Sequence, residues 1–122
     1  MHYFEDFSGL KLANSCVTIG SYDGIHLGHQ KIINALTEYS KNEKIPSVVV
    51  TFYPNPKVFF RHIDGAYYLT APEYKAVLLE EMGVDYVITH PFNQDVANLR
   101  AVEFIDRIHD QIHFSKMFIG HD

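Results

Sequence analysis

Residues 20–29 read Gly-Ser-Tyr-Asp-Gly-Ile-His-Leu-Gly-His, and this stretch decides the fold of the chain. It follows a largely β-branched run at residues 16–19, which predicts a short buried strand. After it, apolar residues recur at helical spacing from Ile32 to Tyr39, which predicts an amphipathic helix. A turn between such a strand and helix lies at the carboxyl end of the strand, where open parallel sheets bind their ligands. We therefore expect a ligand site at residues 20–29.

The residue types in this turn suit the binding of phosphate groups. Gly20, Gly24 and Gly28 let the backbone approach a ligand closely. A helix that opens near Gly28 presents unpaired backbone N–H groups and a partial positive charge. His26 and His29 are three positions apart, so they share a face if the first helical turn includes both. Two imidazoles placed in this way can donate hydrogen bonds to a polyphosphate.

Other interpretations of the turn stay open at this point. Asp23 can cap the helix or orient a ligand hydroxyl. The pattern is not a Walker P-loop, because no Gly-Lys-Ser/Thr follows, and its glycine spacing differs from GxGxxG. The pair His26 and His29 could bind a metal, yet no third ligand stands nearby in the sequence. A structural turn with two solvated histidines is the plain alternative.

Length and composition exclude several classes of protein. At 122 residues, of which 47% are hydrophobic, the chain is expected to form one globular domain. The net charge of −5 without a cluster of Lys or Arg disfavours nucleic acid as a partner. We expect neither a signal peptide nor a membrane span, since no long apolar run occurs. Cys16, the sole cysteine, suits a reducing cytoplasm and is expected to be a small core residue.

The rest of the chain continues the alternation of strands and helices. Residues 1–14 are a short strand or lead-in, and the further strands are expected at 47–52, 84–89 and 116–120. A helix is expected from the capping box at Thr70 to Gly83, with Val77 inward, and another at 101–111, with Val102 inward. Because helical crossovers imply parallel strands and right-handed connections, we predict a Rossmann-like three-layer α/β/α fold with a parallel sheet.

Two blocks of the sequence resemble a known family. Residues 26–29, His-Leu-Gly-His, are a form of the HxGH motif of the nucleotidylyltransferase superfamily. The longer run at 17–30 resembles the adenylyltransferase (FAD synthetase) domain of bacterial bifunctional riboflavin kinase/FAD synthetases. Residues 49–56, Val-Val-Thr-Phe-Tyr-Pro-Asn-Pro, are similar to its second motif, usually Thr-Phe-Asp-Pro-His-Pro. Residues 119–122 look like the start of its Val-Gly-x-Asp/Asn-Phe motif.

The resemblance implies an ATP:FMN adenylyltransferase, which transfers AMP from ATP to FMN and releases pyrophosphate, with Mg²⁺ bound through the substrate phosphates. His26 and His29 would be the catalytic residues and would also bind the ATP phosphates. The other ATP-binding residues implied are Gly20, Asp23, Gly24, Gly28 and Asp122. The FMN-binding residues implied are Thr51, Pro54, Asn55 and Pro56. The FMN phosphate is already anionic, so positioning and charge stabilisation suffice without a general base.

The sequence also departs from the family pattern. Tyr53 and Asn55 replace the usual Asp and His, and Arg100 replaces a Ser, which removes a helix cap worth about 1 kcal/mol. The family continues with a segment that closes the nucleotide site and with a riboflavin kinase domain. We therefore expect residues 1–122 to be a single, C-terminally incomplete domain without the kinase domain, whose exposed apolar surface would favour self-association. The alternatives are another HxGH nucleotidylyltransferase with a different phosphorylated acceptor, or a noncatalytic nucleotide- or flavin-binding module.

Overall fold

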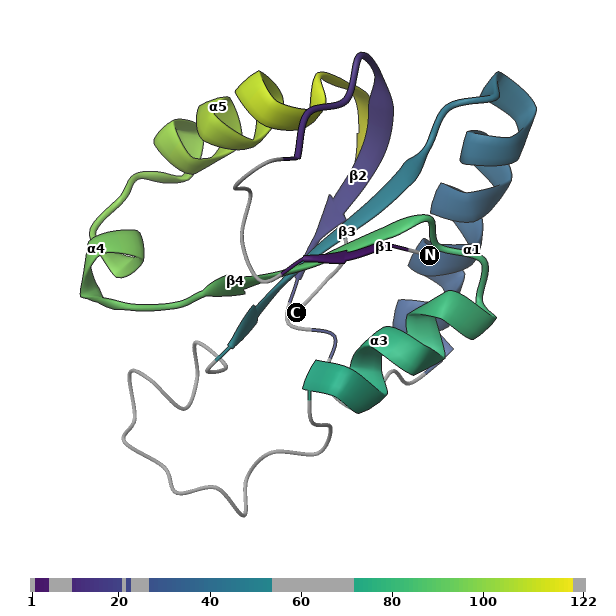
Figure 1. Ribbon diagram of the computed structural model, residues 1–122, viewed down its shortest axis with the longest axis horizontal. Helices are drawn as coiled ribbons and strands as arrows, with labels where there is room; N and C mark the ends of the chain where they lie inside the picture. The colour runs from purple at the N-terminus through teal and green to yellow at the C-terminus, as the bar shows by residue number, and fades with distance from the viewer. Residues whose placement is uncertain (1, 5–9, 21, 23–26, 54–71, 120–122) are drawn as a thin grey trace.

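The computed structural model of the chain describes residues 2–4, 10–20, 22, 27–53 and 72–119 (Figure 1). Along these residues the elements are β1 (His2–Phe4), β2 (Ser15–Ile19), α1 (Leu27–Glu43), β3 (Ser47–Tyr53), α3 (Pro72–Glu81), β4 (Tyr86–Pro91), α4 (Gln94–Ala97), α5 (Ala101–Ile112) and β5 (Phe114–Phe118). The predicted alternation of strands and helices is confirmed, with strand ends shifted by two residues in β4 and β5.

The strands form one parallel sheet in the order β1-β4-β3-β2-β5. From β2 the chain steps through β3 to β4 in one direction, and β5 then returns to the other side of β2. The strand order therefore reverses between β2 and β5. In open α/β sheets, ligands bind outside the carboxyl ends of the strands at such a reversal.

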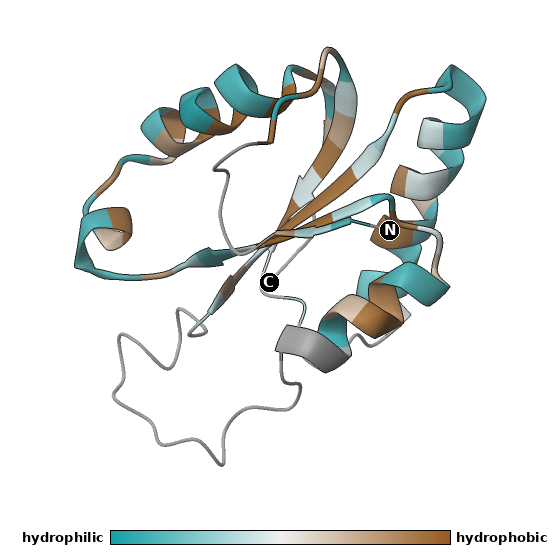
Figure 2. Cartoon of the chain, in the orientation of Figure 1, coloured by the Kyte–Doolittle hydropathy of each residue, from teal (hydrophilic) through white to brown (hydrophobic). Residues whose placement is uncertain are grey.

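Two hydrophobic cores lie on opposite faces of the sheet, as Figure 1 shows by the helices that cover them. On one face, α1 and α3 bring Ile33, Leu36 and Leu79 against the sheet. On the other, α5 contributes Ile108 and Ile112. Alternate residues of a strand point to opposite faces, and both faces of the inner strands β2 and β3 are covered. These two strands are accordingly buried and largely apolar at their centres, as Figure 2 shows. The predicted three-layer α/β/α fold is thereby confirmed.

The predicted inward positions of Val77 and Val102 are wrong, because their side chains are 50% and 54% exposed. In α5 the side chains that reach the core are spaced by four residues, at Phe104, Ile108 and Ile112, and Val102 lies on the other side of the helix. Among the side chains of α3 that the structure describes, Leu79 is fully buried against the sheet, and Val77, two positions earlier, lies on the exposed side of the helix. Apolar residues at helical spacing allow more than one stripe, and packing against the sheet selects one.

Two features go beyond what the sequence indicated. Residues 1–14 contain a short strand, one of the two expectations for this segment, but its parallel pairing with β4 at the edge of the sheet was not anticipated. The short helix α4 begins after Asn93, whose side-chain oxygen accepts a hydrogen bond from the backbone N–H of Val96 at 3.0 Å. Asn is a preferred N-cap residue, so this signal was present in the sequence.

Candidate active site

The turn after β2 and the start of α1 lie at the carboxyl edge of the sheet. The backbone N–H of Gly20 donates to the carbonyl of Val50 at 3.0 Å, which continues the β2–β3 ladder by one step. Helix α1 begins at Leu27, so Gly28 is its second residue and its N-terminal N–H groups open at this edge. The predicted order of strand, turn and helix is thus confirmed. His26 precedes the helix, and with Asp23 and Gly24 it lies outside the described residues.

His29 lies in the first turn of α1 with only 5% of its surface exposed. Its ring packs edge-on against the ring of Tyr22, with centroids 5.0 Å apart. Tyr22 is itself 1% exposed and has a positive φ of 53°, which is uncommon for a residue other than glycine. Whether His26 and His29 act together on a polyphosphate stays a prediction.

A chain of hydrogen bonds joins the turn to β5. The hydroxyl of Thr18 donates to the carbonyl of Phe118 at 2.8 Å. Since that hydroxyl has one proton, the Tyr22 hydroxyl donates to Thr18 Oγ1 in the hydrogen bond between them. Thr18 and Phe118 are paired in the β2–β5 ladder, so this network lies at the reversal of strand order. The sequence did not indicate this role of Tyr22, whose partners become adjacent only in the folded chain.

The predicted FMN-binding residues follow β3. Thr51 lies within β3 and is 1% exposed, and its Oγ1 accepts a hydrogen bond from Lys75 Nζ at 3.1 Å. Pro54, Asn55 and Pro56 lie outside the described residues, as does Asp122 of the predicted ATP side. Lys75 on α3 is only 2% exposed. Its position among the apolar residues of α3 was the signal in the sequence for a buried cation.

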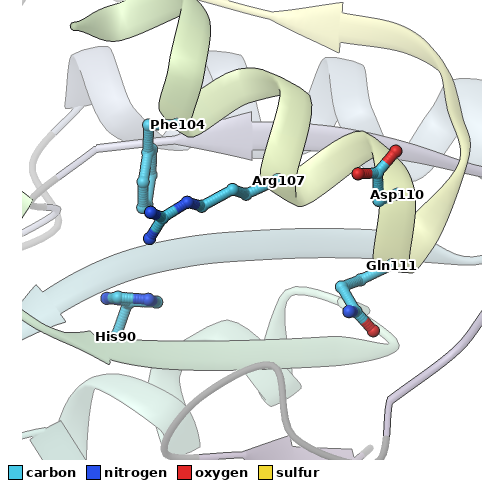
Figure 3. Close-up of a pocket in the computed structure, with 5 residues that line it drawn as sticks. All are labelled: His90, Phe104, Arg107, Asp110 and Gln111. Carbon is cyan, nitrogen blue, oxygen red and sulfur yellow. The ribbon is translucent and has the colours of Figure 1, made fainter. Parts of the chain in front are cut away.

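A separate cavity of about 250 Å³ lies on the opposite face of the sheet, between β4 and α5 (Figure 3). Its lining residues are His90, Phe104, Arg107, Asp110 and Gln111. The rings of His90 and Phe104 meet edge-on with centroids 5.3 Å apart. This cavity is covered by α5, whereas the turn after β2 continues into α1 on the other face. It is therefore not part of the candidate active site.

Within the described part of the chain, no three His, Cys, Asp or Glu side chains are grouped so that they could hold a metal ion. In that same part, no helix combines the length and the apolar character that a membrane crossing requires.

Comparison with known proteins adds family information to this geometry. A family model described as FAD synthetase matches residues 10–122. The bifunctional riboflavin kinase/FMN adenylyltransferase of Pseudomonas fluorescens is 43% identical over 94 residues, covering 76% of this chain and 30% of that protein. The protein of the same name from Buchnera aphidicola subsp. Acyrthosiphon pisum is 33% identical, covering 90% of this chain and 36% of its own length. The chain thus spans about a third of these relatives.

Among solved structures, a macrolide-efflux protein from Streptococcus pneumoniae matches with a TM-score of 0.78 and 23% identity. The match covers 96% of this chain and 40% of that one. At this level of identity the likeness shows the fold alone, and it agrees with the sheet described above.

Proposed function

We propose a function from the premise that this chain belongs to the FAD synthetase family. The proposed reaction transfers AMP from ATP to FMN and so forms FAD and pyrophosphate. The observation that carries the proposal is the placement of the glycine- and histidine-bearing turn. It joins β2 to the N-terminus of α1 at the edge where the strand order reverses. This is the position at which an open α/β sheet binds a nucleotide, with phosphate oxygens facing a helix N-terminus.

In the proposed reaction, an oxygen of the FMN phosphate attacks the α-phosphorus of ATP. A new P–O bond forms there while the bond from the α-phosphorus to the bridging oxygen breaks, and pyrophosphate carries away the electron pair. His26 and His29 would donate hydrogen bonds to the phosphates and stabilise the charge that develops. Mg²⁺ bound through the phosphates would neutralise part of the charge on the leaving pyrophosphate.

We expect ATP and FMN to bind at different places along the carboxyl edge of the sheet. Gly20, Asp23, Gly24 and Gly28 would line the ATP phosphates, and Asp122 after β5 would lie near the nucleotide. On the FMN side, the expected contacts are Thr51, Pro54, Asn55 and Pro56. Small nucleotides are thus the proposed partners. A cytoplasmic location and self-association are further proposals.

The test is FAD formation by the purified protein from ATP, FMN and Mg²⁺, followed by chromatography, with pyrophosphate release measured in parallel. A His29→Ala variant is expected to lower the rate about 100-fold or more, as is typical when a group that stabilises transition-state charge is lost. His109→Ala is the matched control, because His109 is exposed on α5. Circular dichroism checks that both variants fold.

Other outcomes distinguish the alternatives. Turnover with pantetheine phosphate or nicotinamide mononucleotide, but not with FMN, identifies a different nucleotidylyltransferase. Binding of ATP and FMN without pyrophosphate release identifies a noncatalytic module. A His29→Ala variant with undiminished turnover contradicts the role given to that side chain.

A further inference from the structure

Two exposed histidines lie next to each other where α5 ends and β5 begins. His109 is in the last turn of α5, and His113 is the C-cap residue of the same helix. The centroids of their rings are 5.7 Å apart. Two imidazoles that bind one tetrahedral Zn²⁺ at Zn–N distances of about 2.0–2.1 Å have centroids about 5 Å apart. A small rotation of two exposed side chains therefore brings this pair to the separation that a zinc ion requires.

The hydrogen bond of His113 leaves one of its ring nitrogens ready for a metal. Its Nδ1 lies 2.7 Å from the carbonyl oxygen of Leu12. Because a carbonyl can only accept, Nδ1 carries the proton, and the neutral ring keeps a lone pair on Nε2. Histidines that bind metals almost always donate their other ring N–H to a carbonyl, a carboxylate or water, which fixes the tautomer and raises the basicity of the ligand.

The backbone of His113 is a second, independent observation. It lies in the left-handed region, at φ 47° and ψ 52°. Many helices end with a residue in this conformation, but that residue is usually Gly, which has no Cβ. A larger residue held there costs free energy, and such positions gather at sites where the side chain has a function. The bond to Leu12 uses only one of the two ring nitrogens, and a metal would use the other.

His109 and its surroundings favour a cation at the same place. Its ring meets the rings of His113 and Phe114 edge-on, and it has no hydrogen bond or ion pair among the residues that the structure describes. The carbonyl groups at the C-terminus of a helix carry a partial negative charge. Asp106, three positions before His109, adds a carboxylate on the same exposed face of α5.

We propose that His109 and His113 bind one Zn²⁺ through their ring nitrogens, with Nε2 as the ligand atom of His113 and water at the remaining positions. Imidazole nitrogen suits zinc among the divalent metals. Leu12 also donates its backbone N–H to the carbonyl of Gln111 at 2.9 Å, so the ion would strengthen a junction between α5, β5 and the segment before β2.

This site lies away from the candidate active site. Helix α5 follows β4 and ends at the start of β5, so its last turn is at the amino edge of the parallel sheet. The turn after β2 is at the carboxyl edge. The zinc site therefore does not depend on the proposed function, and FAD formation is not expected to require it.

The test is isothermal titration calorimetry of the protein, without a histidine tag and without nucleotide, with ZnCl₂ as the probe. His109→Gln and His113→Asn are each expected to weaken binding of one Zn²⁺ at least about 10-fold. Gln is a good helix former, and Asn tolerates the left-handed cap position. His2→Gln is the matched control, because His2 is exposed on β1, at the other edge of the sheet from β5, and its loss is expected to leave this binding unchanged.

The histidine ring signals of the wild type in NMR spectra provide a second measurement if a variant does not fold. Zn²⁺ is expected to shift the signals of His109 and His113 and to spare those of His2. Zinc binding that neither substitution weakens, or that shifts other histidines instead of this pair, overturns the inference. A wild-type protein that binds no Zn²⁺ also overturns it. Neither result bears on FAD formation, which is measured with Mg²⁺ and without zinc.

Discussion

Tyr22 joins the turn after β2 to the neighbouring strand β5. Its backbone occupies the left-handed region at a φ of 53°, so surrounding contacts must hold it there. Its hydroxyl donates a hydrogen bond to Thr18, whose own hydroxyl donates to the carbonyl of Phe118. Its ring also packs edge-on with the ring of His29. Because these groups flank the reversal of strand order, Tyr22 fixes the turn where the ATP is expected.

Replacing Tyr22 with phenylalanine keeps the ring and removes only the hydroxyl. We expect the free energy of unfolding to fall by about 0.5–1.5 kcal/mol, the net value of one hydrogen bond. Urea denaturation measures this change. Tyr39→Phe is the matched control: Tyr39 is half-buried, and no hydrogen bond of its hydroxyl is present among the described residues. Equal effects of the two substitutions would show that the bond to Thr18 adds no stability.

At the scale of the elements, α5 begins with half of a capping box. Glu103 accepts hydrogen bonds from the backbone N–H of Arg100 at 3.2 Å and from its Nε at 2.9 Å. These bonds, with that of the Arg100 side chain as the larger contribution, hold the pKa of Glu103 below its ordinary value. The Arg100 side chain has no acceptor for the helix N–H groups, so the reciprocal half of the box cannot form. The sequence predicted that Arg100 removes the helix cap that a Ser would supply, and Arg100 makes no side-chain cap hydrogen bond to α5.

Arg100→Ser completes the capping box, because a serine hydroxyl can accept from the backbone N–H of Glu103. We expect the free energy of unfolding to rise by about 0.5–1 kcal/mol. The lost ion pair between Arg100 and Glu103 is solvent-exposed and contributes little. Urea denaturation at high and low salt separates the two effects. A variant that is no more stable than the wild type would contradict the assigned cap.

For the molecule as a whole, the core on the α1 face contains an ionisable group. Cys16 is fully buried there, as predicted for a small core residue, and its Sγ lies 3.6 Å from the carbonyl oxygens of Leu36 and Pro46. Burial is the main reason that the pKa of this thiol rises from 9.0 to about 11, and the nearby carboxylate of Asp85 adds to it. The native state therefore keeps the proton over a range in which the unfolded chain loses it.

This difference predicts a pH dependence of global stability. Between pH 9.0 and about 11 the unfolded chain binds fewer protons at Cys16 than the native state does. The stability that the neutral thiol contributes is thus fully present below pH 9.0 and is lost as the pH rises through about 11. The stability advantage of the wild type over Cys16→Ala should shrink across this range in urea denaturation. A constant difference would mean that the thiol titrates alike in both states.

Part of the candidate site was predictable from the sequence, since a glycine- and histidine-bearing turn between a strand and a helix is encoded in consecutive residues. Lys75 was not predicted as a site residue. Its contact with Thr51 spans 24 positions and depends on how α3 packs against β3. The link from Tyr22 through Thr18 to Phe118 likewise depends on the pairing of β2 with β5.

The sequence by itself determined the α/β class, the order of the main strands and helices and the place of the turn, because strand and helix periods and glycine spacing are local properties. Only the tertiary structure decided that Val77 and Val102 face solvent, that β1 joins the sheet beside β4, and which side chains meet at its carboxyl edge. The physical reason is that each of these outcomes is set by packing between segments far apart in the chain. A periodic pattern allows several such arrangements, and the burial of both sheet faces selects one.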